Sequence, residues 1–170
     1  MSRILHALHR KWNLFLVNKV LAGTSPRRFE RKRRLLNAIG FEIGEGSKIV
    51  GPIFCTGKLE IGGNCWIGRN LRIDGNGSVT IGDNCDIAPE VIFETGGHRI
   101  GAPQRRAGKG ENYRISVGDG TWICAGAMVL GAASVGSGCI VAALACVTKD
   151  VTDNTMVGGI PAHFIQELPI

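Results

Sequence analysis

An aliphatic residue returns at every sixth position over most of the chain, and a second set of small or apolar residues follows four positions after each. The first register comprises Ile43, Ile49, Cys55, Ile61, Ile67, Ile73, Ile81, Ile87, Phe93, Val117, Ile123, Val129, Val135, Val141 and Val147. The second comprises Ser47, Ile53, Leu59, Cys65, Leu71, Gly77, Cys85, Val91, Thr121, Ala127, Ala133, Cys139, Ala145 and Val151. This spacing matches neither the helical repeat of about 3.6 residues nor the strand repeat of about two.

A period of six fits short strands joined by tight corners, where Gly, Asn or Asp adopts a positive φ. Such hexapeptide repeats are typical of a parallel β-helix, in which each coil packs only on its neighbours. A sandwich would instead show alternating residues with turns about every 8–12 positions, and that spacing is absent. We therefore expect an all-β fold, a parallel β-helix with an N-terminal helical extension and one protruding loop. The expected divisions are a basic amphipathic extension at 1–40, the β-helix at 41–160 with loop 99–116, and a C-terminal tail at 161–170.

The extension carries most of the positive charge. Residues 1–34 hold ten Lys or Arg and one acidic residue, a net +9, whereas residues 35–170 have a net charge of −3. Its apolar residues lie near helical spacing and predict an amphipathic helix: Ile4, Leu5, Leu8, Trp12, Phe15, Leu16, Val20 and Leu21. Gly23 and Pro26 end this helix, and residues 27–40 resemble a second one.

Two roles for the extension stay open at this point. It can cap the open end of the solenoid, because terminal repeats need a cover. It can also bind an anionic membrane surface through residues 1–34, using their basic and aromatic side chains. Nucleic acid is not an expected partner, since no recognised binding motif accompanies the charge.

The bulk composition indicates one domain without a membrane span. The chain has 170 residues, 44% of them hydrophobic, and its 25 glycines can form the corners. Basic and apolar residues are interleaved at the N-terminus, which argues against a cleaved signal peptide. Four of the six cysteines fall on the inward registers and no CxxC pair exists, so we expect reduced core thiols in a cytoplasmic protein. His6 and His9 have no carboxylate nearby and are expected to be a surface pair.

The six-residue pattern is interrupted once, and His98 stands where the interruption begins. Residues 99 to about 116 are rich in glycine and arginine, and His98 is the only histidine between His9 and His163. Insertions in a solenoid loop out from one face, which is often the binding face. A histidine at the root of such a loop is a candidate catalytic residue, although a lone surface histidine is often inert.

From Ile61 to Leu168 the chain resembles the hexapeptide-repeat acetyltransferases, and within them the branch of galactoside, maltose and nodulation-factor O-acetyltransferases. The resemblance rests on three stretches: VTIGDNCDIAPEVIFETGGH (79–98), VGDGTWICAGAMVLGAASVGSGCIVAALACVTKDV (117–151) and MVGGIPAHFI (156–165). It implies a left-handed β-helix, an exception to the usual crossover hand. It also implies acetyl-CoA as donor and a homotrimer whose active sites lie between subunits.

The resemblance assigns the catalytic roles. A sugar hydroxyl needs a base to remove its proton as it attacks a thioester, and the family position of that base is His98. The tetrahedral oxyanion needs a hydrogen-bond donor, and the matching motif gives the backbone N–H of Ala125. Trp122 occupies the position that packs beside the catalytic loop, and packing at a corner is its plainer interpretation.

The donor and acceptor positions follow the same matches. Ala125, Ala143, Thr148, Lys149 and Pro161 match coenzyme-binding positions, with Lys149 as a candidate phosphate contact. His163 stands where relatives often have basic residues that reach the nucleotide phosphates, which leaves the grip on the coenzyme open. Asp74 and Asn76 could face the acceptor near His98 or serve as corner residues.

The sequence thus favours an acetyltransferase that modifies a hydroxyl of a sugar or of a cell-surface glycan precursor. N-acetylation of an amino sugar or sugar nucleotide is the alternative within the enzyme class, and a non-catalytic β-helix scaffold is the alternative outside it. A γ-type carbonic anhydrase would need three histidines around a metal, and residues 10–162 contain only His98. No metal is expected. The expected location is the cytoplasm, at the inner membrane if the extension is an anchor.

Overall fold

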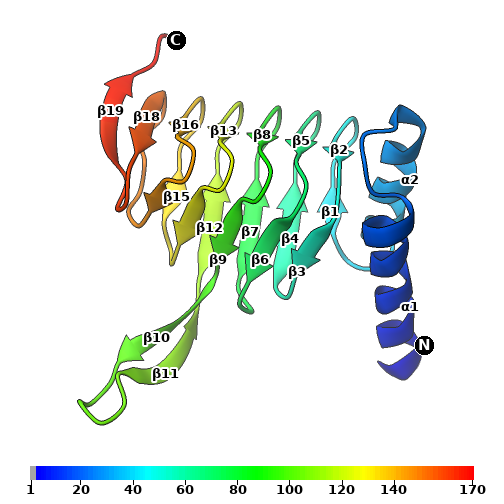
Figure 1. The fold of residues 1–170 in the computed structure, drawn as a ribbon, viewed down its shortest axis with the longest axis horizontal. Coiled ribbons are helices and arrows are strands. Elements are labelled where there is room, and N and C mark those ends of the chain that lie inside the picture. The colour runs from blue at the N-terminus through cyan, green and yellow to red at the C-terminus, as the bar shows by residue number, and fades with distance from the viewer. Residues whose placement is uncertain (1–2) are drawn as a thin grey trace.

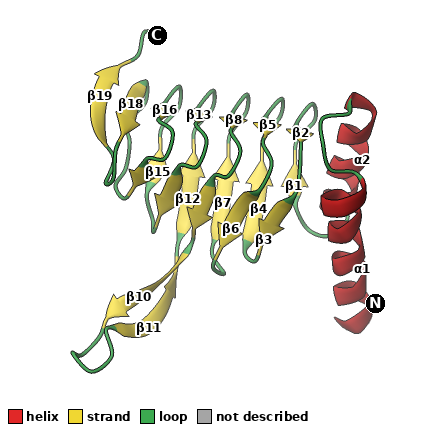
Figure 2. Cartoon of the chain, viewed as in Figure 1, coloured by secondary structure: helices red, strands yellow, loops and turns green. Residues whose placement is uncertain are grey.

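The computed structural model describes residues 3–170 and consists of a stack of short strands with two helices across one end (Figures 1 and 2). Residues 1–2 of the expected extension lie outside the described residues. The strands form three parallel faces of a left-handed β-helix, as the resemblance implied. No helix within 3–170 is long and apolar enough to cross a bilayer.

Each face is a ladder of strands from successive coils. Face 1 contains β1 (Glu42–Ile43), β4 (Lys58–Ile61), β7 (Ser78–Ile81), β12 (Arg114–Val117) and β15 (Ser134–Val135). Face 2 contains β2 (Lys48–Ile49), β5 (Trp66–Ile67), β8 (Asp86–Ile87), β13 (Trp122–Ile123), β16 (Ile140–Val141), β18 (Thr155–Gly158) and β19 (His163–Glu167). Face 3 contains β3 (Ile53–Cys55), β6 (Leu71–Asp74), β9 (Ile92–Glu94), β14 (Met128–Leu130) and β17 (Cys146–Val147).

The predicted registers form the core. Each coil places its inward residue on the equivalent residue of the next, as in Ile43 on Ile61 and Ile61 on Ile81. All of the first register is buried except the half-buried Cys55, and all of the second except the half-buried Gly77 and Val151. All six cysteines are free thiols. The stack of identical aliphatic positions explains why a period of six is the strongest pattern in the sequence.

The N-terminal helices cap the first coil. They are α1 (Arg3–Phe15), a π-helical turn η1 (Leu16–Val20) and α2 (Pro26–Asn37), so the second helix ends three residues before the expected residue 40. Val17 and Leu36 are buried against the inward registers of the coil. The helices cover the end of the solenoid, as expected for a cap.

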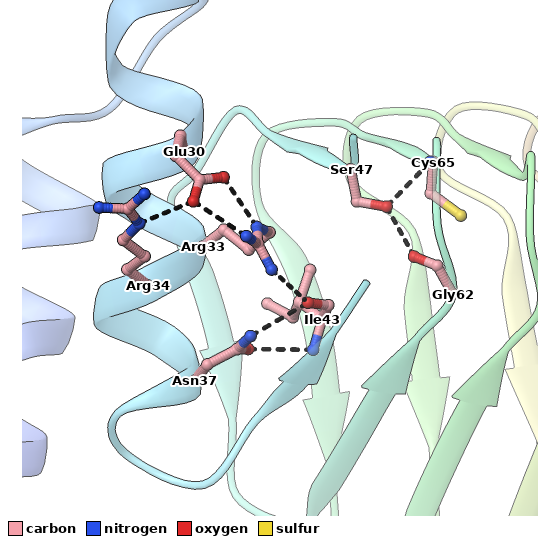
Figure 3. A network of polar contacts seen from close by, with 8 residues as sticks. All are labelled: Glu30, Arg33, Arg34, Asn37, Ile43, Ser47, Gly62 and Cys65. Carbon is pink, nitrogen blue, oxygen red and sulfur yellow. Dashed lines mark hydrogen bonds and ion pairs between the residues drawn. The ribbon is translucent and has the colours of Figure 1, made fainter. Parts of the chain in front are cut away.

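Polar side chains of the cap bind backbone groups that the first coil leaves without a strand partner. Asn18 donates to the carbonyl of Ile53 (2.8 Å) and accepts from its N–H (3.0 Å). Asn37 does the same for Ile43, at 3.0 Å in both directions (Figure 3). Lys32 is fully buried and donates to the carbonyls of Gly23 (2.8 Å) and Val50 (3.0 Å). Amide and ammonium groups therefore take the place of a further strand.

The interruption is a β-hairpin whose bounds differ from the expected loop 99–116. Strand β10 (Gly96–Ile100) pairs antiparallel with β11 (Ala107–Asn112), and the hairpin extends away from the solenoid (Figure 1). Arg114 already belongs to β12, where it pairs with Ser78 of the preceding coil. The excursion therefore begins and ends about three residues earlier, because Gly96 and Gly97 already pair across the hairpin and Ile115 returns to the core.

The segment expected as a tail, 161–170, contains strand β19. It pairs antiparallel with β18 and so ends the parallel ladder of face 2.

Candidate active site

His98 lies on β10, in the first pairs of the hairpin. It stands opposite Gly110, and its exposed ring places Nδ1 2.8 Å from the carbonyl oxygen of Gly108. A carbonyl oxygen can only accept a hydrogen bond. In the neutral ring, Nδ1 therefore carries the hydrogen, and Nε2 has a free lone pair. The hairpin thus fixes both the ring orientation and the tautomer that a general base needs.

The neighbouring side chains of the hairpin form one network. Arg99 forms an ion pair with Glu111, and the hydroxyl of Tyr113 donates to the same carboxylate at 3.2 Å. The Arg99 guanidinium lowers the pKa of Glu111, so that carboxyl stays ionised beside His98. Gly97 allows the close contact, since a Cβ there would meet the Tyr113 ring at 2.8 Å.

Below the hairpin, the corner between faces 3 and 1 carries Asp74 and Asn76. The backbone N–H of Thr95 bonds the carbonyl of Asp74 at 2.8 Å, which fixes this corner directly under the hairpin root. Gly75 between them has φ +90°, and a Cβ on it would meet the Gly96 nitrogen at 2.3 Å. Asp74 ends β6, and Asn76 lies in the turn that follows it and lines the same cavity as His98.

A cavity of about 510 Å³ opens at this corner. Its polar lining comes from Asn76, Glu94, His98, Glu111 and Asn112. Asp74 is not part of the lining, because its carboxylate is held by Arg72 (2.8 Å). Another cavity, of about 550 Å³, lies beside α2, but no histidine lines it. The cavity at the hairpin root is therefore the candidate site, because it contains the acid–base group.

Trp122 lies elsewhere, on the outer side of face 2. It pairs in register with Asp86, which pairs with Trp66, and the two indoles flank the carboxylate. These three residues line a second cavity of about 440 Å³, together with Ala88 and Pro89. Half of the Trp122 surface is exposed. Face 2 is the side of the triangular coil opposite the corner that carries His98, so one chain does not bring the two residues together.

Ala125 occupies a tight turn at the corner between faces 2 and 3. The N–H of Ala127 donates to the carbonyl of Cys124 (3.2 Å), and Gly126 has φ +69°. These features define a type II turn in which Ala125 and Gly126 are the two central residues. Within residues 3–170 the Ala125 N–H donates no hydrogen bond, whereas its carbonyl accepts one from Leu144 (3.0 Å). The turn therefore presents an unused, rigidly held donor.

The expected coenzyme positions fall into two groups. Ala125, Ala143 and Pro161 follow one another along the corner between faces 2 and 3, linked by bonds such as Cys146 N–H to Gly159 carbonyl at 2.9 Å. Thr148 and Lys149 lie after β17, at the corner between faces 3 and 1. His163 is exposed on β19.

Comparisons with known proteins decide the family. No protein-family model matches the chain. Nodulation protein L of Rhizobium meliloti (strain 1021) is 33% identical over 124 residues, covering 72% of this chain and 68% of that protein. This chain belongs to the hexapeptide-repeat acetyltransferases.

Two further relatives agree with this family. The galactoside O-acetyltransferase of Escherichia coli (strain K12) is 28% identical over 145 residues, covering 84% of this chain and 71% of that protein. The crystal structure of a hexapeptide-repeat acetyltransferase of Vibrio cholerae, complexed with acetyl coenzyme A, superposes with a TM-score of 0.82 at 24% identity. It covers 99% of this chain and 91% of the other, and it shows the shared fold.

As an acetyltransferase, the chain offers acid–base groups rather than metal ligands. Among residues 3–170 no three His, Cys, Asp or Glu side chains gather where they could hold a metal ion. The arrangement supplies an oriented imidazole at one corner and an unused backbone donor at another. Those are the two groups that transfer of an acyl group to a hydroxyl needs.

Several residues of the site were not found from the sequence: Gly108, which orients His98, and the pair Glu111 and Tyr113. The segment is polar and glycine-rich, so it shows no alternation that would predict strands. A turn around Ala102 and Pro103, between extended stretches of similar length, is the feature that could have indicated a hairpin.

Proposed function

We propose that this acetyltransferase transfers an acetyl group from acetyl-CoA to a hydroxyl of a sugar or a glycan precursor, with His98 as the general base. The observation that carries the proposal is the hydrogen bond from Nδ1 to the Gly108 carbonyl, which leaves Nε2 free beside a polar cavity. Relatives named galactoside O-acetyltransferase support the sugar hydroxyl as acceptor.

In the proposed reaction, Nε2 of His98 removes the proton of the acceptor hydroxyl while the hydroxyl oxygen attacks the carbonyl carbon of the thioester. The N–H of Ala125 from the neighbouring subunit donates to the oxyanion that forms. When the carbon–sulfur bond breaks, the imidazolium of His98 returns its proton to the leaving thiolate, so the base is regenerated. A positioned base contributes about 10²–10⁴ to such a rate, and one backbone donor contributes about 10²–10³.

We propose that a complete site needs two subunits of a homotrimer. His98 projects from the corner between faces 3 and 1, while Trp122 lies on face 2, on the opposite side of the same coil. A head-to-tail contact that joins these two surfaces closes into a ring. Three solenoids side by side would then form three equivalent sites, each with His98 from one chain and Trp122 from the next.

The coenzyme row is part of the same proposal. Ala125, Ala143 and Pro161 form an exposed line of small residues, where a pantetheine chain can approach backbone amides. Lys149 supplies positive charge for the phosphates at the corner shared with His98, and the exposed ring of His163 can donate a hydrogen bond to them. Asn76 is proposed to bind the acceptor. Asp74 forms an ion pair with Arg72 and so orients this arginine at the same corner.

His98→Asn tests the base. We expect kcat to fall by about 10²–10⁴ while acetyl-CoA binding stays close to the wild-type value. The matched control is His9→Asn, an exposed histidine of α1, which should leave kcat unchanged. Near-normal turnover of His98→Asn with saturating acceptor would refute the role of His98.

An acceptor panel tests the substrate class. Thiol release from acetyl-CoA should be stimulated by neutral sugars, sugar nucleotides or cell-surface glycans that offer a hydroxyl. Stimulation by amino sugars alone, with an N-acetyl product, would replace the O-acetylation proposal. Acetyl-CoA binding without transfer to any acceptor in the panel would favour a scaffold.

A further inference from the structure

Helix α1 turns its polar side toward the solenoid. Arg10 donates to the carbonyls of Ile39 (3.3 Å) and Cys55 (3.0 Å), and its guanidinium lies 5.4 Å from the centre of the Phe41 ring. Asn13, 3% exposed, donates to the carbonyl of Leu35 at 2.9 Å. These contacts, together with Leu14, which packs against the core, hold α1 on the first coil.

The opposite side of α1 is an exposed apolar stripe, which we call the outer stripe. It consists of Ile4 (72% exposed), Leu8 (58%), Trp12 (59%) and Phe15 (49%). The four residues recur at helical spacing, and the rings of Trp12 and Phe15 stack at 5.7 Å. An amphipathic helix normally buries such a stripe against its own protein, so an exposed one marks a surface for a partner.

The charges around the outer stripe fit an anionic partner. Helix α1 contains no acidic residue, and the one acidic residue of the first 34, Glu30, is paired with Arg33 and Arg34. Arg10 and Lys32 are engaged in the cap, and five other basic residues are exposed without an ion pair to any described residue: Lys11, Lys19, Arg27, Arg28 and Arg31. Aromatic and aliphatic residues beside unpaired cations are typical of helices that lie in the interface of an anionic bilayer.

We infer that the outer stripe of α1 binds the surface of an anionic phospholipid bilayer, while the inner side of the same helix remains the cap of the solenoid. The cap and the membrane anchor are then two sides of one helix. The helix runs across the end of the solenoid, and the His98 hairpin leaves from the middle coils (Figure 1). Lipid contact at the end therefore leaves the catalytic corner open.

This inference does not depend on acetyl transfer. If the chains form the proposed trimer side by side, cyclic symmetry brings three outer stripes to the same end, and their binding is strengthened by multivalency.

The test uses the full chain, because deleting α1 would also remove the cap. Sedimentation is measured with vesicles of phosphatidylcholine and with vesicles containing phosphatidylglycerol, at low and high salt. We expect binding to the anionic vesicles and at least about tenfold weaker binding for the double variant Leu8→Gln, Trp12→Gln. Its melting temperature and its acetyl transfer to a soluble acceptor should match the wild type, since the outer stripe contacts neither the core nor the site.

The matched control is Ile170→Gln, which removes a fully exposed apolar side chain at the other terminus and should bind as the wild type does. Undiminished vesicle binding by the double variant would overturn the inference, as would absence of binding by the full chain. Concentration-dependent association of the wild type that the double variant abolishes, without vesicle binding, would show that a second copy covers the stripe instead.

Discussion

In the coils, the aliphatic residues of the two registers point inward, whereas in α1 the outer stripe faces solvent and the polar residues Arg10 and Asn13 point toward the solenoid. The coils can bury their apolar residues because the backbone groups of their strands pair with the neighbouring coils. The first coil has no preceding coil, so its outward-looking N–H and C=O groups need donors and acceptors. The cap meets that need with Arg10, Asn18, Lys32 and Asn37.

This difference shows that hydrophobic periodicity and burial are separate properties. In the coils they coincide, and in α1 they are opposed. Stability at the helical end should therefore depend on hydrogen bonds as well as on the packing of Val17 and Leu36, while stability along the coils should depend mainly on packing.

The largest expected difference is between two phenylalanines. Phe93 is 0% exposed in the coil stack, so Phe93→Ala should lower the free energy of unfolding by about 3–5 kcal/mol. Phe15 belongs to the outer stripe, and Phe15→Ala should change it by less than about 0.5 kcal/mol. Urea denaturation of both variants, at one protein concentration, measures the contrast. Equal losses would mean that α1 packs its apolar side on the protein.

A smaller effect is expected for a polar residue of the cap. Asn18→Ala removes both partners of the buried Ile53 backbone and should lower the free energy of unfolding by about 1–3 kcal/mol. Gln104→Ala, at the exposed tip of the hairpin, should stay within about 0.5 kcal/mol of the wild type. If the free energy of unfolding of Asn18→Ala changes as little as that of the control, hydrogen bonds of the cap do not stabilise the helical end.

The smallest effect is a pH dependence from Lys32. Burial lowers the pKa of its ammonium from 10.5 to about 8. Between these values the unfolded chain binds more protons than the folded one, so the free energy of unfolding rises with pH, and this gain is lost as pH falls toward 8. The contribution should be about 1 kcal/mol between pH 8 and 9.

Lys32→Met should lack that rise, and the difference between the two denaturation series isolates it. Lys19→Met is the control, because Lys19 is exposed. A wild-type curve parallel to that of Lys32→Met over this range would contradict the assignment.

The β-helix and its core were predictable because the inward positions are fixed by coil geometry, which repeats in the sequence. Cys55 shows the limit of that rule. It occupies the inward register but is half-buried; it lies in the first coil, where Arg10 of α1 rather than a preceding strand bonds its carbonyl. The position of His98 at the start of the excursion was also predictable, because the six-residue period breaks directly after this residue.

The hairpin and the orientation of α1 were not predictable in the same way. Hairpin pairing depends on backbone bonds between glycine-rich strands, which leave no alternating pattern, so Gly108 could not be identified as the partner of His98. For α1 the spacing of Ile4, Leu8 and Trp12 identifies an apolar side but not the direction it faces. That direction is set by Arg10, Asn13 and Asn18, whose carbonyl partners lie up to 45 residues away.

The bond between His98 and Gly108 divides the hairpin into a part that must be preserved and a part that is free to vary. The imidazole is held by the paired strands near the root, while residues 101–106 lie beyond the last pair, Ile100 with Ala107. Substitutions, or changes of length, at that distal end leave the imidazole and its tautomer in place. A lineage could thus diversify the tip, or an engineer could graft a new one, while the orientation of the His98 ring stays unchanged.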